Sequence, residues 1–236
     1  MKIVYISILP VIIICTLISA VWAHSEKINP VNNIKTYQDM VEFLGDYSVN
    51  ATEIESDEEI NDLIDKQIKT FNGENILTHS DVNIFVVEVR NELRCYTDMF
   101  SQSANVKKVI KGDQSLINKD IDILSYLFFA NNEENSMASE SFSGSFYRNL
   151  MIPGKRYAVF CEKSEISDYY SIPKYRTFMT TFSCLALETD SIGTVDTLNN
   201  HYINYIENEF LVQNLQTANS YNEIKHIILK KFKIES

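Results

Sequence analysis

The first part of the chain carries apolar residues at helical spacing. One stripe ends at Gly45, a residue that favours a left-handed cap, and this predicts a short amphipathic helix. A second stripe follows the capping box Ser56-Asp57-Glu58-Glu59, whose acids suit the positive end of a helix. The stripes consist of Tyr37, Met40, Val41 and Leu44, and of Ile60, Leu63, Ile64, Ile68 and Phe71. We therefore expect two N-terminal helices.

From residue 82 the pattern becomes extended. Runs of β-branched and aromatic residues predict strands, and Phe85, Val87 and Val89 share one face of the first, as in a half-buried or central strand. The strands are expected at residues 82–89, 104–110, 155–161 and 175–187. Lys111-Gly112 and Pro153-Gly154 predict turns between them. Residues 117–130 fit either a helix or a strand, and residues 131–144 read as a polar loop.

The C-terminal fifth returns to helical spacing. Thr194 is expected to cap one helix, and Ser220 with Glu223 forms a capping box for another. Their apolar positions are Val195, Leu198, Tyr202, Tyr205 and Ile206, and Ile224, Ile227, Ile228 and Phe232. The lysines at positions 230, 231 and 233 suit the negative end of the second helix.

The order of the extended segments resembles a known family. The segments are Val82–Val89, Val106–Gly112, Leu150–Phe160 and a strand ending at Cys184. They resemble the netrin-like module of tissue inhibitors of metalloproteinases, over about residues 80 to 205. The resemblance implies a five-stranded OB-type barrel with helices packed at its ends. It also implies an extracellular module that binds or modulates a partner.

The fold class expected is α+β. An antiparallel OB-like barrel or curved sheet at residues 80–193 would follow an N-terminal helical segment at residues 24–79. Two C-terminal helices at residues 194–236 would pack on the barrel. One domain with appended helices suits this length better than two independent domains.

Residues 1–23 are typical of a cleaved signal peptide. Lys2 forms a positive n-region, an apolar h-region follows, and Val21 and Ala23 are the small residues a signal peptidase requires. The alternative is a membrane anchor, but the apolar run is short and Pro10 interrupts it. We expect a secreted, extracellular protein that begins at His24. Inhibitors of the resembled family need a cysteine at that position, so their zinc-chelating terminus is not implied here.

The charge balance excludes some partners. With 21 basic and 32 acidic side chains the formal net charge is −11, which repels nucleic acid and anionic membrane surfaces. The mature form is therefore expected to bind neither nucleic acid nor membrane.

Three cysteines remain after the signal peptide takes Cys15: Cys95, Cys161 and Cys184. One disulfide and one further thiol is the simplest arrangement for a secreted chain, and the spacing does not suit a metal site. In a simple hairpin Cys184 would lie opposite Lys155, too far from Cys161 to bond, so Cys95 would take one of the two. Asn50-Ala51-Thr52 is a glycosylation sequon.

Two weaker constellations would suit a secreted enzyme. His24 with His79, His201 or His226 has the inventory of a copper histidine brace. The order of arginine, serine and glutamate residues is similar to that of secreted ADP-ribosyltransferases, although E-x-x-E places its acids on opposite faces of a strand. The residues concerned are Arg90 or Arg94, Ser141-Phe142-Ser143, Glu162 and Glu165.

No serine-hydrolase motif supports Ser145 as a nucleophile, because no G-x-S-x-G is present. Several tyrosines fit either a recognition surface or a core, namely Tyr169, Tyr170, Tyr175, Tyr202 and Tyr205. The function expected is a non-enzymatic binding or inhibitor-type module for an extracellular protein partner, with no cofactor. The alternative is a secreted ADP-ribosyltransferase-like toxin or effector, or less favourably a copper monooxygenase.

Overall fold

A computed structural model describes ten stretches of the chain. They are residues 33–45, 48–50, 82–96, 99–126, 136–138, 147–165, 171–178, 181–195, 201–212 and 214–234. The signal peptide, the second N-terminal stripe and most of the polar loop at residues 131–144 lie outside these residues, so their expected structures stay predictions.

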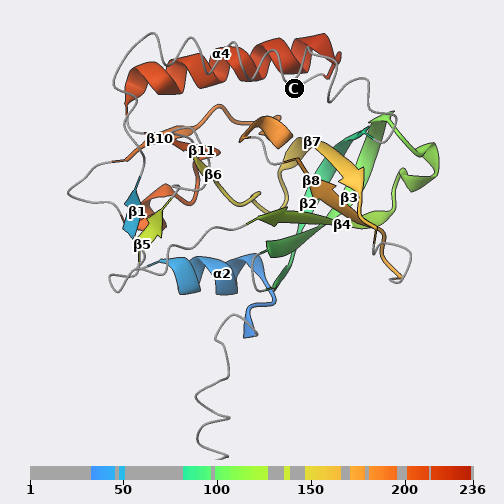
Figure 1. Ribbon diagram of the computed structural model, residues 1–236, viewed down its shortest axis with the longest axis horizontal. Coiled ribbons are helices and arrows are strands. Elements are labelled where there is room, and N and C mark those ends of the chain that lie inside the picture. The colour runs from blue at the N-terminus through green and yellow to red at the C-terminus, as the bar shows by residue number, and fades with distance from the viewer. Residues whose placement is uncertain are drawn as a thin grey trace, which may run out of the picture.

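The centre of the molecule is a five-stranded mixed β-barrel (Figure 1). Its strands are β2 (Val82–Cys95), β3 (Met99–Lys111), β4 (Asp120–Tyr126), β7 (Arg156–Lys163) and β8 (Lys174–Thr177). The pairing order is β2-β3-β4-β8-β7, and β7 returns to pair antiparallel with β2, which closes the ring. This order is compatible with an OB fold.

The sequence predicts an antiparallel barrel. The barrel is instead mixed, because β4 and β8 run parallel. A closed ring with an odd number of strands cannot alternate direction all the way round, so at least one neighbouring pair must be parallel. The ambiguous segment at residues 117–130 contains β4 and is therefore a strand over residues 120–126.

The apolar run of β2 is buried on both faces. Phe85, Val87 and Val89 point into the barrel, where they meet residues from every other barrel strand. Ile84 and Val86 point outward into a second cluster that includes the C-terminal helix. The predicted central strand is confirmed, and its near-continuous hydrophobicity follows from this double burial.

Both predicted turns are present. Gly112 ends β3 with φ +122, and a side chain there would meet the Oδ1 atom of Asn83 at 2.4 Å. Gly154 adopts φ +79 before β7. Both backbone conformations favour glycine over residues with a Cβ atom.

The strand expected at residues 175–187 is broken into three pieces. β8 is followed by a 3-10 turn at Thr181–Ser183 and then by β9 (Cys184–Ala186), which pairs with β7 outside the barrel order. β8 and β9 pair with different parts of β7, namely residues 161–163 and 157–159. One straight strand could not serve both positions.

The first N-terminal helix is confirmed as α2 (Tyr37–Leu44), which buries Met40, Val41 and Leu44. Thr36 and Asp39 form a reciprocal capping box at its start. The expected left-handed cap is wrong, because Gly45 is right-handed at φ −52 and ψ −39.

The described residues hold one C-terminal helix in place of the expected two. Thr194 ends a strand, β10 (Ile192–Thr194), and Tyr202–Tyr205 forms a 3-10 helix in which both tyrosines are buried. Residues three apart lie on the same side of a 3-10 helix, so the spacing of Tyr202 and Tyr205 suits a 3-10 helix as well as an α-helix. The remaining helix, α4 (Leu215–Lys231), begins before Ser220 because Asn214 caps it by accepting a hydrogen bond from the Thr217 amide.

Short strands complete the fold. β10 pairs parallel with β11 (Phe210–Val212), which pairs antiparallel with β6 (Tyr147–Arg148). β1 (Ser48–Asn50) pairs parallel with β5 (Ser136–Ala138), and a 3-10 turn at Gln114–Leu116 follows β3. No helix within the described residues is long and apolar enough to cross a membrane.

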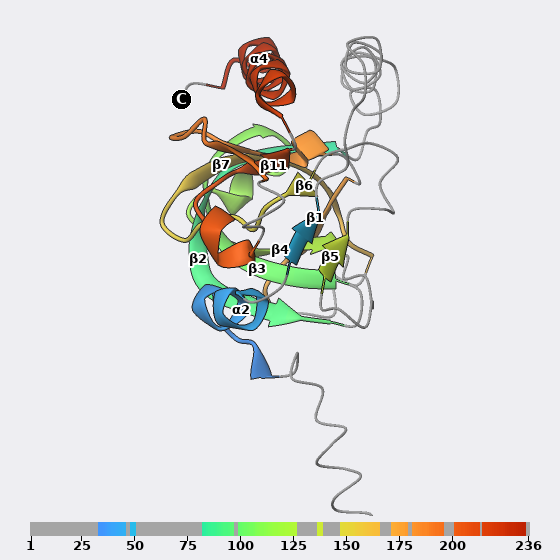
Figure 2. The same ribbon diagram turned by 90° about the vertical axis from the view of Figure 1, so that its left-hand side faces the viewer.

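The helix α4 covers one side of the strands, with α2 on the opposite side (Figures 1 and 2). Tyr221 of α4 stacks against Phe182 and Phe210, with ring centroids 4.9 and 5.2 Å apart. Ile224 and Ile228 extend this buried face along the helix. The packing of α4 therefore depends on an aromatic and aliphatic stripe that meets the outer face of β2 and β7.

Two isoleucines of α4 offer a matched test of this packing. Ile224 is 2% exposed and Ile227 is 42% exposed. We expect Ile224→Ala to lower the free energy of unfolding by about 2–5 kcal/mol, because it leaves a cavity. Ile227→Ala should change it by less than about 0.5 kcal/mol. Urea denaturation followed by circular dichroism measures both, and equal losses would contradict the docking of α4.

Candidate functional site

A polar cleft lies on the outer face of three neighbouring barrel strands. It encloses about 360 Å³. Its lining residues are Arg90, Glu92 and Arg94 from β2, Ser101 and Ser103 from β3, Asp120 and Asp122 from β4, and Ile172 from the β7–β8 connection. We call this feature the polar cleft.

Strand alternation places these side chains outside the barrel. On β4, Ile121 and Ile123 point into the barrel core, so Asp120 and Asp122 point outward. On β3, Phe100 and Ala104 are in the core, and Ser101 and Ser103 take the other face. The floor of the cleft is therefore formed by the polar residues that alternate with core residues along each strand.

Most charges of the cleft are neutralised within the molecule. Lys174 Nζ donates to Asp122 Oδ2 at 2.8 Å, and their side chains are 2% and 6% exposed. Arg90 lies 3.5 Å from Asp120 and 3.6 Å from Glu88. Asn105 Nδ2 also donates to Asp120, at 2.8 Å. These contacts hold the acidic side of the cleft in place.

Arg94 differs from the other cations of the cleft. It is exposed and makes no ion pair or side-chain hydrogen bond with another described residue. The hydroxyls of Ser101 and Ser103 likewise have no such partner. These three groups are the hydrogen-bond donors that the cleft leaves available to a ligand.

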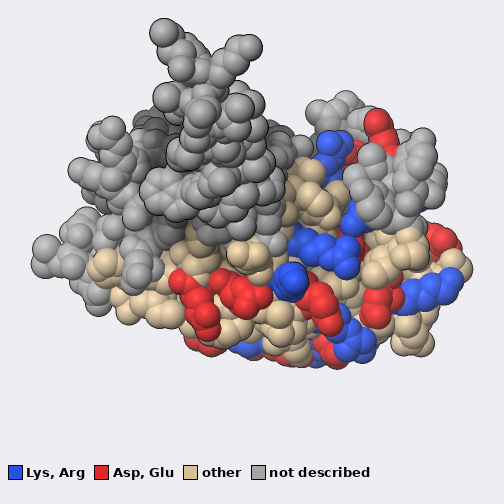
Figure 3. All heavy atoms as spheres, turned by 90° about the horizontal axis from the view of Figure 1, so that it is seen from below, with Lys and Arg blue, Asp and Glu red and all other residues tan. Residues whose placement is uncertain are grey.

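The surface charge around the described strands is mixed. Figure 3 shows acidic and basic side chains next to one another on the face that it presents. Lys107 with Glu88 at 3.3 Å and Arg156 with Glu188 at 2.6 Å are examples of paired surface charges. The described part of that face offers no continuous basic patch of the kind that nucleic acid requires.

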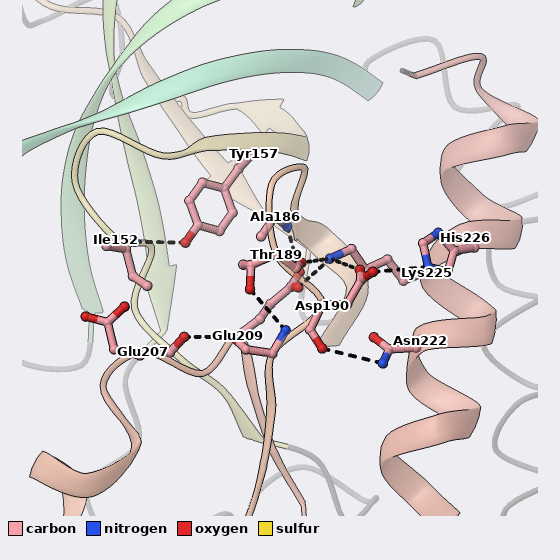
Figure 4. A network of polar contacts seen from close by, with 11 residues as sticks. Ile152, Tyr157, Ala186, Thr189, Asp190, Glu207, Glu209, Asn222, Lys225 and His226 are labelled. Carbon is pink, nitrogen blue, oxygen red and sulfur yellow. Dashed lines mark hydrogen bonds and ion pairs between the residues drawn. The ribbon is translucent and has the colours of Figure 1, made fainter. Parts of the chain in front are cut away.

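A second polar cluster joins α4 to the loops beside the barrel (Figure 4). Lys225 is 1% exposed, and its Nζ atom donates to Glu209 Oε2 at 2.6 Å and to the Thr189 carbonyl at 2.5 Å. Asp190 Oδ1 lies 3.1 Å from the same nitrogen. The three protons of the ammonium group therefore have three acceptors, and the cluster holds the helix without leaving a donor for a ligand.

Glu209 is the buried acid of this cluster. Its Oε1 atom accepts a hydrogen bond from the Ala186 amide at 2.6 Å. Burial raises the pKa of Glu209 to about 7, against the opposing effect of Lys225 and the Ala186 amide. His226 lies on the exposed side of α4, with Nε2 3.5 Å from Asp190. Since the cluster is saturated by its own members, we assign it a structural role.

The three cysteines are free thiols in this structure. The expected position of Cys184 is wrong, because it pairs with Val159 and not with Lys155. Cys161 is therefore a diagonal neighbour of Cys184 in the barrel core. Diagonal neighbours across two strands are about 7–8 Å apart, beyond the reach of an unstrained disulfide. Cys95 lies at the end of β2, in a different cluster.

The enzyme-like constellations are not assembled by the described residues. The strand register places Glu162 opposite Val82, whereas Arg90 lies eight residues further along β2. That separation is about 26 Å at about 3.3 Å per residue. Glu162 is instead paired with Arg176. Glu165 is exposed beyond β7, and residues 141–145 lie outside the described part of the chain.

Of the four histidines, His201 and His226 are exposed, and His24 and His79 lie outside the described residues. Among the residues that are described, no three His, Cys, Asp or Glu side chains gather as a metal site would require. Asn50 ends β1 and pairs with Ala138, but Thr52 of its sequon is outside the described residues. Glycosylation there stays a prediction.

Three of the tyrosines considered for a recognition surface belong to the core. Tyr175, Tyr202 and Tyr205 are 4%, 0% and 7% exposed. Tyr175 makes an edge-on contact with Phe85 at 5.0 Å. Tyr169 and Tyr170 are outside the described residues. Recognition by these described tyrosines is therefore not supported.

The sequence patterns predict neither the polar cleft nor the role of Lys225. Lys225 falls within the buried stripe of α4, between Ile224 and Ile228, and a lysine at such a position signals a buried partner. The cleft residues had no comparable signal, because they come from three strands whose register is not encoded locally.

Searches of protein-family models and of curated proteins find no match to this chain. The barrel and its cleft are therefore the basis for any functional conclusion.

Glu209 predicts a pH dependence of stability. Its pKa is raised from 4.5 to about 7, so the folded state binds the proton more tightly than the unfolded state. Between about pH 4.5 and 7 the free energy of unfolding should therefore fall as pH rises, by up to about 1.4 kcal/mol per pH unit from this group. Glu209→Gln should remove that slope, as measured by urea denaturation across this range.

The control for this experiment is Glu223→Gln, which changes an exposed acid on α4. It should leave the wild-type slope unchanged. A wild-type slope that survives in Glu209→Gln would show that other groups cause the dependence.

The thiols predict a pattern of reactivity. Burial raises the pKa of Cys95 from 9.0 to about 11, which lowers its thiolate fraction about 100-fold at neutral pH. Cys161 and Cys184 are 0% and 1% exposed, and burial raises the pKa of Cys161 well above its usual value. Under iodoacetamide, we expect Cys95 to react slowly and the other two only after unfolding. Intact mass reports the order, and rapid labelling of Cys161 in the folded chain would contradict this assignment.

Proposed function

We propose that this chain is a secreted, non-enzymatic binding module of the netrin-like type, which engages an extracellular protein partner through the polar cleft. The observation that carries this proposal is the position of the cleft on the barrel. It lies over β3 and β4, the second and third strands, and includes Ile172 from the connection between the fourth and fifth strands.

This position supports a binding role because of the barrel's architecture. OB-type barrels bind ligands on the face of their second and third strands, between the connections that flank it. The polar cleft lies on the corresponding strands, and Ile172 of the connection from β7 to β8 lines it. The core of the barrel is filled by side chains, so a ligand has this outer face available and not the interior.

The charge pattern favours a protein over nucleic acid. The whole chain has a formal net charge of −11, and the cleft combines arginine, serine and acidic side chains. Polar groups of both signs are typical of protein interfaces, where complementary pairs determine orientation and partner choice. A nucleic-acid site would need an excess of basic side chains.

Two features support the netrin-like assignment. The segments 82–89, 104–110 and 155–161 belong to one sheet, and β9 with Cys184 pairs with the same sheet. The helix α4 packs on the outside of the barrel. No cysteine stands at the expected mature terminus, His24, so the proposed module acts differently from an inhibitor that chelates a metalloproteinase zinc.

The proposal is tested with the full chain expressed in a secreting cell and recovered from the medium. Its intact mass should correspond to a chain that begins at His24, allowing for glycosylation at Asn50. The wild-type protein is then immobilised and exposed to extracellular fluid, and bound proteins are identified by mass spectrometry.

The discriminating variant is Ser103→Tyr, which places a large side chain inside the cleft. Lys108→Tyr puts the same side chain at an exposed position of β3 outside the cleft and serves as the control. We expect one set of partners to be retained by the wild type and the control, and to fall at least about tenfold with Ser103→Tyr, a loss of about 1.4 kcal/mol. Equal capture by all three proteins, or recovery of the chain only inside the cell, would overturn the proposal.

A further inference from the structure

We infer that Arg94, together with the hydroxyls of Ser101 and Ser103, forms the binding position for a carboxylate side chain of the protein partner. This inference rests on the proposed function, because it names the chemistry that the polar cleft recognises.

The strand register brings the three donors to one place. Arg94 and Ser101 are direct partners across β2 and β3, so their Cβ atoms are about 4.5–5.5 Å apart. Ser103 lies two residues further along β3 on the same face, and lines the cleft as Ser101 does. A guanidinium group offers several N–H donors in a plane that matches a carboxylate, and each hydroxyl adds one O–H donor.

The position of Ser101 distinguishes this site from a single exposed arginine. The residue is only 2% exposed and still lines the cleft, yet its hydroxyl makes no side-chain hydrogen bond with any described residue. Because Ser101 lines the cleft, this hydroxyl is open to a hydrogen bond with a group that enters the cleft. A ligand oxygen that enters the cleft would satisfy Ser101 and neutralise Arg94 at the same position.

The charges around Arg94 leave room for an anion. Asp122 is already paired with Lys174, and Asp120 with Arg90, so neither opposes a ligand strongly. Glu92 makes no ion pair with another described residue and shares the outer face of β2 with Arg94. The repulsion from Glu92 and the attraction of Arg94 both scale with the charge of the ligand, so geometry and not charge decides the assignment. The two coplanar oxygens of a carboxylate match the planar N–H groups of the Arg94 guanidinium, and we therefore assign a carboxylate to this position.

The test uses the full chain labelled with 15N-arginine and the NMR signal of the Arg94 Nε–H group, assigned with Arg94→Lys. The probe is N-acetyl-glutamate amide, added at constant ionic strength, and N-acetyl-glutamine amide is its uncharged counterpart. We expect a saturable shift of the Arg94 signal, with a dissociation constant on the order of millimolar. Arg156 is paired with Glu188 outside the cleft, and its signal should stay in place.

Ser101→Ala provides the second arm and should weaken probe binding about 2- to 10-fold by removing one donor. Ser115→Ala, at an exposed serine outside the cleft, should have no effect. Equal shifts at Arg94 and Arg156, equal effects of the two amides, unchanged affinity in Ser101→Ala, or a stronger response to inorganic phosphate would each overturn the inference.

Capture experiments separate this inference from the proposed function. If Arg94→Gln retains the partners that Ser103→Tyr loses, the cleft binds a protein by other contacts and the carboxylate position is wrong. If both variants lose the same partners while Lys108→Tyr keeps them, the proposed function and this inference are supported together.

Discussion

The pairing of β2 with β7 is the interaction on which the rest of the structure depends. It closes the ring of strands through seven successive residue pairs, from Val82 with Glu162 to Glu88 with Arg156. Closure gives β2 a barrel core on one face and the α4 contact on the other. The ladder of β2 with β7 ends at Glu88, and beyond that residue β2 continues along β3, where Arg90 and Arg94 form one side of the polar cleft. Core, helix docking and candidate site thus share one strand.

Two buried ion pairs among the described residues connect different elements of this arrangement. Lys174 and Asp122 are direct partners across the parallel pair β4–β8, the junction that an odd-numbered ring cannot avoid. Lys225 and Glu209 connect α4 to the loop that precedes β11. Replacing one partner alone would leave an uncompensated buried charge, at a cost of about 3–5 kcal/mol. Each pair therefore specifies which elements lie together more than it adds to net stability.

The sequence predicts the strands well where burial is simple. The double-sided burial of β2 leaves an apolar run that any register would preserve, and α2 has a complete amphipathic stripe. The prediction fails where the same spacing suits two structures, as with Tyr202 and Tyr205. It also fails where a capping residue lies upstream of the predicted capping box, as Asn214 lies upstream of Ser220. The polar cleft was out of reach because Arg94, Ser101 and Asp122 become neighbours only through strand register. Local patterns do not carry that information.

The separation of β2 from β7 in the sequence has a consequence for biosynthesis. Val82 and Glu162 are 80 residues apart, so β2 leaves the ribosome well before its second partner exists. In that interval only the hairpin with β3 can cover one edge of β2. Long-range pairings of this kind fold slowly and leave hydrophobic strand edges exposed to other chains. The nascent protein therefore passes through a stage in which the edge of β2 that later meets β7 has no partner strand.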